Sequence, residues 1–166
     1  MRQRAIILRG HMSQLFMGAQ APDFELKDLN GQSLHLASAL NQGPVVLAFY
    51  KAACPTCQFT FPYLQKIFSD VRRRPATPIW GISQDDLAET RRFAEEFGIT
   101  FDLLIDEYPY PVSSAYSLKS VPAIFVVGTD GIISLSDFGF TKASLNQIAG
   151  FEWFSPNDGL PASRPG

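Results

Sequence analysis

The sequence predicts an α/β protein in which a central mixed β-sheet is flanked by helices and preceded by an N-terminal β-hairpin. Between residues 44 and 127, apolar runs typical of buried strands alternate with segments of helical periodicity, the order that builds a parallel sheet. The dipeptides Asn30-Gly31 and Asp130-Gly131 each separate two short alternating segments, and both are strong hairpin signals. Strands joined by helices and strands joined by hairpins together indicate a mixed sheet.

The chain has the length of one domain. It contains 166 residues, of which 46% are hydrophobic and 18% charged, a composition that excludes disorder over most of its length. We expect a weakly ordered extension over residues 1–17 and the α/β domain over residues 18–154. Residues 155–166 are rich in Pro, Gly and Ser and lack periodicity, which predicts a flexible tail.

The elements follow in chain order. Residues 21–36 form the hairpin, with His35 on its exposed side. The apolar run 44–50 predicts a strand buried on both faces, and Pro55 suits the first turn of a long helix that ends at Arg74 and Pro75. The other expected elements are strands over 78–82, 101–106, 123–127 and 132–138 and helices over 85–97, 112–117 and 142–149.

Several charged and aromatic groups have a structural explanation. Asp85-Asp86 is expected on the solvated surface of a helix, and Asp106 is expected in a turn. We interpret Arg72, Arg73 and Arg74 as cations at a helix C-terminus, where they oppose the negative end of the dipole. The aromatic residues near the end of the domain are expected to dock the last helix on the sheet: Phe151, Trp153 and Phe154.

Charge and hydropathy exclude two classes of partner. The net charge is −2, so the chain lacks the basic face expected of a nucleic-acid binder. No apolar run approaches the ~18 residues that a membrane span needs. The apolar stretch Ala5–Leu8 is shorter than the core of a signal peptide. We therefore expect a cytoplasmic protein, with a periplasmic location as the alternative if a signal has been removed.

The two cysteines of the chain form one C-x-x-C motif, Cys54 and Cys57. With no other thiol, the chain is not a disulfide-stapled scaffold. A structural zinc needs four ligands, and His11 and His35 stand in other segments, so no metal and no other cofactor is expected. The motif lies where the first buried strand meets the first long helix.

That position favours redox chemistry over two inert core cysteines. Cys54 stands at a helix N-terminus, where unpaired N–H groups and the dipole stabilise a thiolate. Cys57 is one turn further on, within disulfide reach and deeper under the helix. Cys54 would attack a substrate disulfide, and Cys57 would resolve the mixed disulfide that forms.

These residues resemble a known family. The segment Val46–Cys57, followed by Phe61-Pro62, looks like the active-site segment of thioredoxin-fold proteins. It is similar above all to the TlpA/ResA-like thiol–disulfide oxidoreductases of the AhpC/TSA (redoxin) superfamily. Residues 18–31 resemble the opening hairpin of that group, and Ser120–Ala123 resembles its cis-proline loop. The similarity covers residues 18–150 and implies a thioredoxin-like three-layer fold.

The resemblance also implies site residues and partners. Pro122 would be cis and face Cys54, and the backbone of Val121 would pair with a bound substrate strand. Pro55 and Thr56 would complete the substrate-binding surface and tune the reduction potential. Disulfide-containing protein substrates and an upstream electron donor, such as a thioredoxin system, are the implied partners.

Three positions depart from the family pattern. Ala53 stands where thioredoxins carry Trp, Ala48 where they carry a buried Asp, and Thr60 where several ResA-like proteins carry Glu. The acid that helps to deprotonate the recessed thiol is thus missing from both expected places. We therefore expect a raised pKa for Cys57.

Two other functions are compatible with such a fold. A peroxiredoxin needs a Thr three residues before its reactive Cys, but Lys51 and Cys54 occupy the positions three before Cys54 and Cys57. A non-catalytic binding module would carry a vestigial or regulatory disulfide. Insulin reduction would indicate the oxidoreductase, peroxide consumption the peroxiredoxin, and an inert Cys54 without either activity the binding module.

Overall fold

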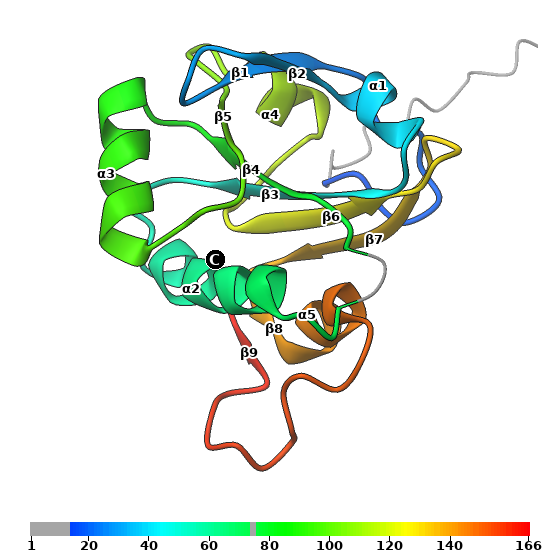
Figure 1. The fold of residues 1–166 in the computed structure, drawn as a ribbon, viewed down its shortest axis with the longest axis vertical. Coiled ribbons are helices and arrows are strands. Elements are labelled where there is room, and N and C mark those ends of the chain that lie inside the picture. Colours follow the sequence, from blue (N-terminus) through cyan, green and yellow to red (C-terminus); the bar gives the residue numbers. More distant parts are fainter. Residues whose placement is uncertain (1–13, 74–75) are drawn as a thin grey trace, which may run out of the picture.

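A computed structural model describes residues 14–73 and 76–166, and a seven-stranded sheet forms the middle of the molecule (Figure 1). Its strand order is β2-β1-β5-β4-β3-β6-β7. The strands are β1 (Glu25–Asp28), β2 (Ser33–His35), β3 (Val45–Tyr50), β4 (Ile79–Ser83), β5 (Leu103–Ile105), β6 (Ala123–Val127) and β7 (Ile133–Phe138). The helices are α1 (Leu36–Leu40), α2 (Pro55–Ser69), α3 (Leu87–Phe97), α4 (Pro111–Ala115) and α5 (Lys142–Ala149).

The sheet is mixed, as predicted. Strands β3, β4 and β5 run parallel, because α2 and α3 carry the chain back between them. The hairpin β1–β2 joins antiparallel to β5, and the hairpin β6–β7 joins antiparallel to β3. In that last pairing Phe49 stands opposite Ala123, which brings the residues before β6 next to the end of β3.

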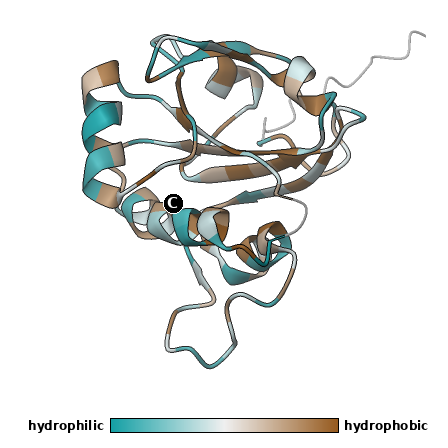
Figure 2. Ribbon diagram, viewed as in Figure 1, coloured by the Kyte–Doolittle hydropathy of each residue, from teal (hydrophilic) through white to brown (hydrophobic). Residues whose placement is uncertain are grey.

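Helices cover both faces of the sheet (Figures 1 and 2). Helices α2, α3 and α5 pack on one face and α1 and α4 on the other. Every residue of β3 is buried, because its side chains alternate between the two cores. Val46, Ala48 and Tyr50 belong to the core under α2.

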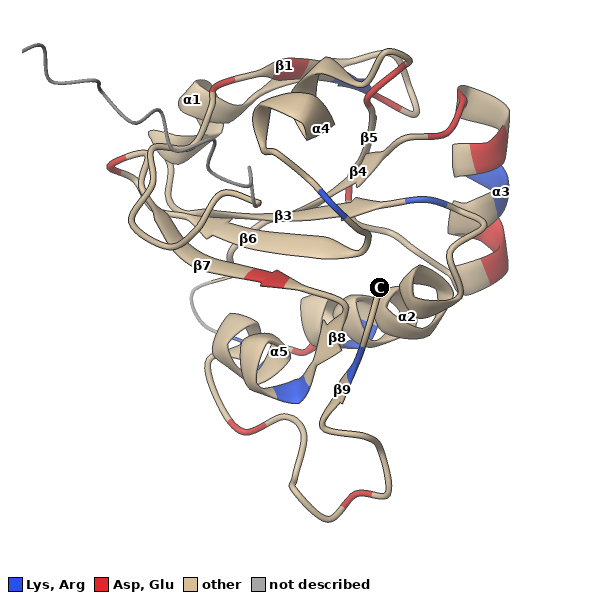
Figure 3. Cartoon of the chain, turned by 180° about the vertical axis from the view of Figure 1, so that it is seen from behind, with Lys and Arg blue, Asp and Glu red and all other residues tan. Residues whose placement is uncertain are grey.

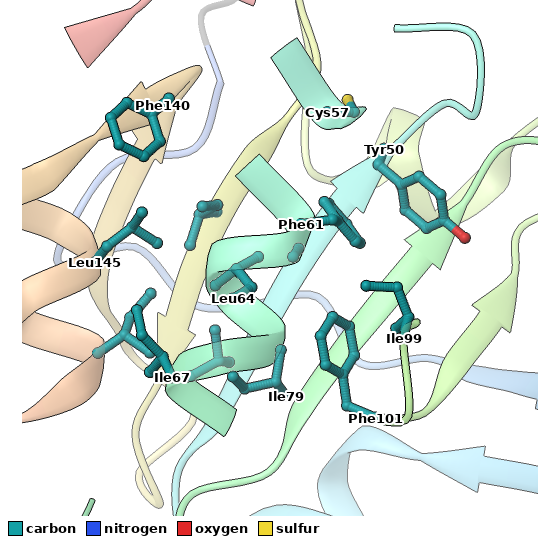
Figure 4. Close-up of a cluster of buried hydrophobic side chains, with 14 of the residues drawn as sticks. Tyr50, Cys57, Phe61, Leu64, Ile67, Ile79, Ile99, Phe101, Phe140 and Leu145 are labelled. Carbon is teal, nitrogen blue, oxygen red and sulfur yellow. The ribbon is translucent and has the colours of Figure 1, made fainter. Parts of the chain in front are cut away.

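The inner side of α2 fixes the position of the C-x-x-C motif. Cys57, Phe61, Leu64 and Ile67 are fully buried at helical spacing (Figure 4). The Phe61 ring lies 4.4 Å from the Tyr50 ring between centroids, so the first turns of α2 are anchored to the end of β3.

Gly81 makes room for this packing. A Cβ at Gly81 would lie 2.4 Å from Leu103 Cδ2 and 3.2 Å from Phe61 Cε1. No larger side chain fits there without displacing a neighbour, so the glycine in β4 lets α2 approach the sheet.

The structure differs from the predicted elements at four places. Helix α2 ends at Ser69, and Arg72 beyond it pairs with Asp70 rather than with the helix end. The predicted end at Arg74 and Pro75 lies outside the described residues. No sequence pattern predicts the other three elements, α1, β8 (Phe140–Thr141) and β9 (Ser163–Arg164).

The chain on either side of the domain also makes contacts. Residues 1–13 of the expected extension lie outside the described residues, but the Gln14 side chain donates to Ser136 Oγ and to the carbonyl of Asp137, each at 3.0 Å. At the other end, β9 pairs antiparallel with β8, although residues 155–166 were expected to lack regular structure. The last aromatic residues were expected to dock on the sheet, but Phe154 is buried against Tyr63 of α2 and Phe140 of β8, which lies outside the seven-stranded sheet.

Candidate active site

Cys54 lies at the N-terminus of α2, where the sequence placed it. It is the N-cap residue, with extended φ and ψ of −78° and 117°, and Pro55 follows in the first turn. The backbone N–H of Cys57 donates to Cys54 Sγ across 3.2 Å. The sulfur is half-buried, accepts this hydrogen bond and lies at the positive end of the helix dipole.

A pair of hydrogen bonds holds the loop that precedes Cys54. The N–H of Ala52 donates to Asp85 Oδ2 at 2.7 Å, and Gln58 Nε2 donates to the carbonyl of Ala52 at 2.8 Å. Asp85 was expected on a solvated surface, but it is half-buried beside the loop. Because β3 and β4 are parallel neighbours, their C-terminal ends meet at one sheet edge, and that register is the signal that could have identified Asp85.

Cys57 is buried and carries a thiol that resists ionisation. Its side chain is 0% exposed in the core between α2 and the sheet. Burial raises the pKa of the Cys57 thiol, and the hydrogen bond with Cys54 and the negative charges of a Cys54 thiolate and Asp85 raise it further. The expected direction is confirmed, with burial as its main cause.

The two positions where family members carry an acid are apolar or hydroxylic here. Ala48 is fully buried in β3, and Thr60 Oγ1 donates to the carbonyl of Thr56 at 2.7 Å. The carboxylate whose charge acts on Cys57 is Asp85, and it raises the Cys57 pKa.

The proline loop faces the nucleophile. The Val121–Pro122 peptide bond is cis, as the resemblance implied, and Tyr108–Pro109 is a second cis bond that was not expected. The Cys54 thiol donates to the carbonyl of Val121 at 3.4 Å. Sequence positions 54 and 121 are thus adjacent, because β6 pairs with β3 directly after Pro122.

The two residues between the cysteines differ in accessibility. Pro55 is exposed next to Cys54. Thr56 is buried, and its hydroxyl donates to the carbonyl of Pro165 at 2.6 Å. Thr56 therefore faces the C-terminal segment of the chain and is closed to solvent, although it was expected to meet substrate.

Other polar groups near the sheet edge have structural partners. Asp106 is fully buried and accepts hydrogen bonds from Val112 N, Ser113 N and Ser113 Oγ, so it caps α4 as a turn residue. Lys51 is exposed, and its Nζ lies 6.0 Å from the centre of the Tyr110 ring. Within the described residues, no three His, Cys, Asp or Glu side chains gather in a way that could hold a metal. The same residues contain no helix long and apolar enough to cross a bilayer.

A C-x-x-C pair at the head of the helix after a central strand, facing a cis-proline loop, defines a thioredoxin-like protein with a dithiol site. The AhpC/TSA family model matches residues 17–136. The chain belongs to the AhpC/TSA family.

Curated relatives share the fold region. The thiol-disulfide oxidoreductase ResA of Halalkalibacterium halodurans is 26% identical over 132 residues, which cover 79% of this chain and 74% of the relative. The thioredoxin-like protein YneN of Bacillus subtilis is 29% identical over 133 residues, covering 78% and 76%.

Solved structures agree on the fold. A putative thiol:disulfide interchange protein DsbE from Chlorobium tepidum superposes with a TM-score of 0.71 at 21% identity, over 82% of this chain and 94% of that one. The peroxidoxin BcpB from Mycobacterium tuberculosis superposes with a TM-score of 0.66 at 27% identity, over 81% and 94%. Both superpositions show the thioredoxin-like fold, so the fold alone does not distinguish disulfide exchange from peroxidase chemistry, and the site residues must.

Proposed function

We propose that this chain is a thiol–disulfide oxidoreductase in which Cys54 is the nucleophile and Cys57 the resolving thiol. The observation that carries the proposal is the asymmetry of the pair: Cys54 is half-buried at a helix N-terminus, and Cys57 is fully buried one turn below it. The relatives named as thiol-disulfide oxidoreductases support the same activity.

The reaction exchanges one disulfide for another. The Cys54 thiolate attacks one sulfur of a substrate disulfide, the substrate S–S bond breaks, and its second sulfur leaves as a thiolate. Cys57 then loses its proton and attacks Cys54 Sγ, which releases the first substrate sulfur. The substrate gains two electrons, and the chain is left with a Cys54–Cys57 disulfide. The reverse sequence oxidises a dithiol.

The backbone of Val121 and the exposed ring of Pro55 provide the surface that a substrate meets beside Cys54. Protein disulfides are the proposed substrates, and a thioredoxin system is the proposed electron donor. The reduction potential of the pair decides the direction of electron flow: a value near about −270 mV means a reductant and one near about −120 mV an oxidant. The expected cytoplasmic location stays a prediction, and a reducing potential would agree with it.

Peroxidase activity is the weaker candidate because of one position. Lys51, not Thr, stands three residues before Cys54, so the hydroxyl that would orient a peroxide is missing. Peroxide consumption is therefore the appropriate negative assay.

Trapping of an intermediate tests the proposal. In a Cys57→Ser variant the mixed disulfide on Cys54 cannot be resolved. A covalent adduct with a disulfide-containing protein such as insulin should therefore accumulate and be visible on non-reducing gels. The Cys54→Ser variant is the matched control and should form none. Adducts on both variants, or turnover by Cys54→Ser, would overturn the assignment of roles, and an inert pair would favour the binding module.

A further inference from the structure

The C-terminal segment of the chain returns to the active site. After α5 the chain loops away from the domain and comes back as β9, and both views place its end beside α2 (Figures 1 and 3). The loop is held at its base by Lys142, whose Nζ bonds to Asp158 Oδ1 and the carbonyl of Ser155, and whose N–H donates to the carbonyl of Ala162 at 3.0 Å.

Three contacts join this segment to the residues around the C-x-x-C motif. Thr56, between the two cysteines, donates its hydroxyl proton to the carbonyl of Pro165 at 2.6 Å. The Arg164 guanidinium lies 4.3 Å from the centre of the Phe59 ring on α2. Gly166 lies so close to the carbonyl of Val121 that a Cβ built on it would be 2.4 Å from that oxygen.

The carbonyl of Val121 also contacts the nucleophile. Val121 O accepts the hydrogen bond from the Cys54 thiol, so Gly166 and Cys54 Sγ meet at one backbone oxygen. A polypeptide disulfide that reaches Cys54 Sγ brings an extended backbone to this place. Residues 163–166 already supply one, since β9 is an extended segment paired with β8.

Glycine stands at both places where the C-terminal segment passes close to the backbone around the proline loop, at positions 139 and 166. Gly139, between β7 and β8, has φ of 72°, and its N–H donates to the carbonyl of Pro122 at 2.8 Å. A Cβ on Gly139 would lie 2.2 Å from the carbonyl oxygen of Arg164. A side chain at position 139 or 166 would therefore push the segment away from the proline loop.

We propose that residues 163–166 form a strap over the substrate-binding surface beside Cys54, and that the strap must lift before a polypeptide disulfide can bind. This inference rests on the proposed function and adds regulation to the same site. The occupant of the surface in the resting state is the chain's own segment Ser163–Gly166. A strap docked about nine-tenths of the time would weaken the apparent affinity for a polypeptide substrate about tenfold.

Removal of residues 163–166 tests the proposal, with Gly166→Leu as a point substitution that keeps the chain length. Asn157→Ala is the matched control, because Asn157 is exposed in the same loop and its hydrogen bond to Ser155 Oγ comes from the backbone N–H, which the variant keeps. The measurements are kcat and KM for a protein disulfide substrate and the rate at which iodoacetamide, a small reagent, alkylates Cys54.

The strap predicts a KM for the protein disulfide lower by about threefold to tenfold in both strap variants, with an alkylation rate within about twofold of the parent. Asn157→Ala should match the parent in both assays. An unchanged KM in enzymes that still turn over would overturn the strap and leave the proposed function intact. Failure of every form, the parent included, to exchange disulfides while Cys54 still alkylates would overturn the proposed function and the inhibitory role together.

Discussion

The two thiols should react with alkylating agents at very different rates, and the slow Cys57 rate should depend strongly on pH. Cys54 is half-buried at the start of α2, whereas Cys57 is 0% exposed under it and burial raises its thiol pKa. Alkylation requires the thiolate. The perturbation is therefore a pH series on the reduced protein, with iodoacetamide as the reagent.

The magnitude follows from the thiolate fraction of Cys57. An ordinary thiol of pKa about 8.5 is about 3% ionised at pH 7, and each further unit of pKa lowers that fraction about tenfold. Because burial raises the pKa of Cys57, its thiolate fraction lies below that of an ordinary thiol, and the buried sulfur must in addition be reached by the reagent. We expect Cys54 to be alkylated at least about 100-fold faster than Cys57 at pH 7.

Mass spectrometry of timed reactions on single-cysteine variants measures both rates. Cys57→Ser reports Cys54 alone, and Cys54→Ser reports Cys57 alone. The Cys57 rate should rise about tenfold per pH unit through the neutral range. Equal rates for the two variants at pH 7, or a Cys57 rate that does not change with pH, would refute the claim that burial keeps this thiol protonated.

Three further outcomes follow from the same structure. The free energy of unfolding of the reduced protein should fall as pH rises above about 8.5, the pKa of an unfolded cysteine. The pKa of Cys57 is higher in the folded state, so its contribution to stability is fully present below about 8.5 and is lost as pH rises toward the folded-state pKa. Urea titrations at several pH values should show a smaller fall for Cys57→Ser. Gly81→Ala should cost about 1–3 kcal/mol in the same assay, since its Cβ would lie 2.4 Å from Leu103 Cδ2, whereas Val71→Ala on the surface should change little, and a neutral Gly81→Ala would contradict the packing. Asp85→Ala should lower the disulfide-exchange rate about fivefold by releasing the N–H of Ala52, Asp85→Asn should restore most of it because its amide oxygen can still accept, and equal rates in both variants would argue against the positioning role.

Local signals were enough to predict the elements that carry the cysteines. The apolar run of β3 and the proline at the start of α2 are read within a few residues, and both were located correctly. The direction of the Cys57 pKa shift was also predicted, from the missing acids at Ala48 and Thr60. The structure shows burial as the larger cause, and burial depends on how α2 packs on the sheet.

The unpredicted parts of the site depend on contacts between distant segments. Asp85 reaches Ala52 only because β3 and β4 are neighbours, which the sequence implies but does not align residue by residue. The strand β9 has two residues and no periodicity, so its pairing with β8 and its contact with Thr56 leave no local pattern. Helix α1 is also short, with five residues directly after β2.

The Ala52 hydrogen bonds connect the dithiol to the neighbouring βα unit. Asp85 donates its own N–H to Ser83 Oγ at the end of β4, and Ser83 Oγ lies 2.8 Å from Thr90 Oγ1 in the first turns of α3. The backbone before Cys54 is thus held by a chain of hydrogen bonds that extends to β4 and α3. We therefore expect the backbone of this loop to keep its position when the pair changes between dithiol and disulfide. Partners would then respond to the state of the two sulfur atoms more than to a conformational change.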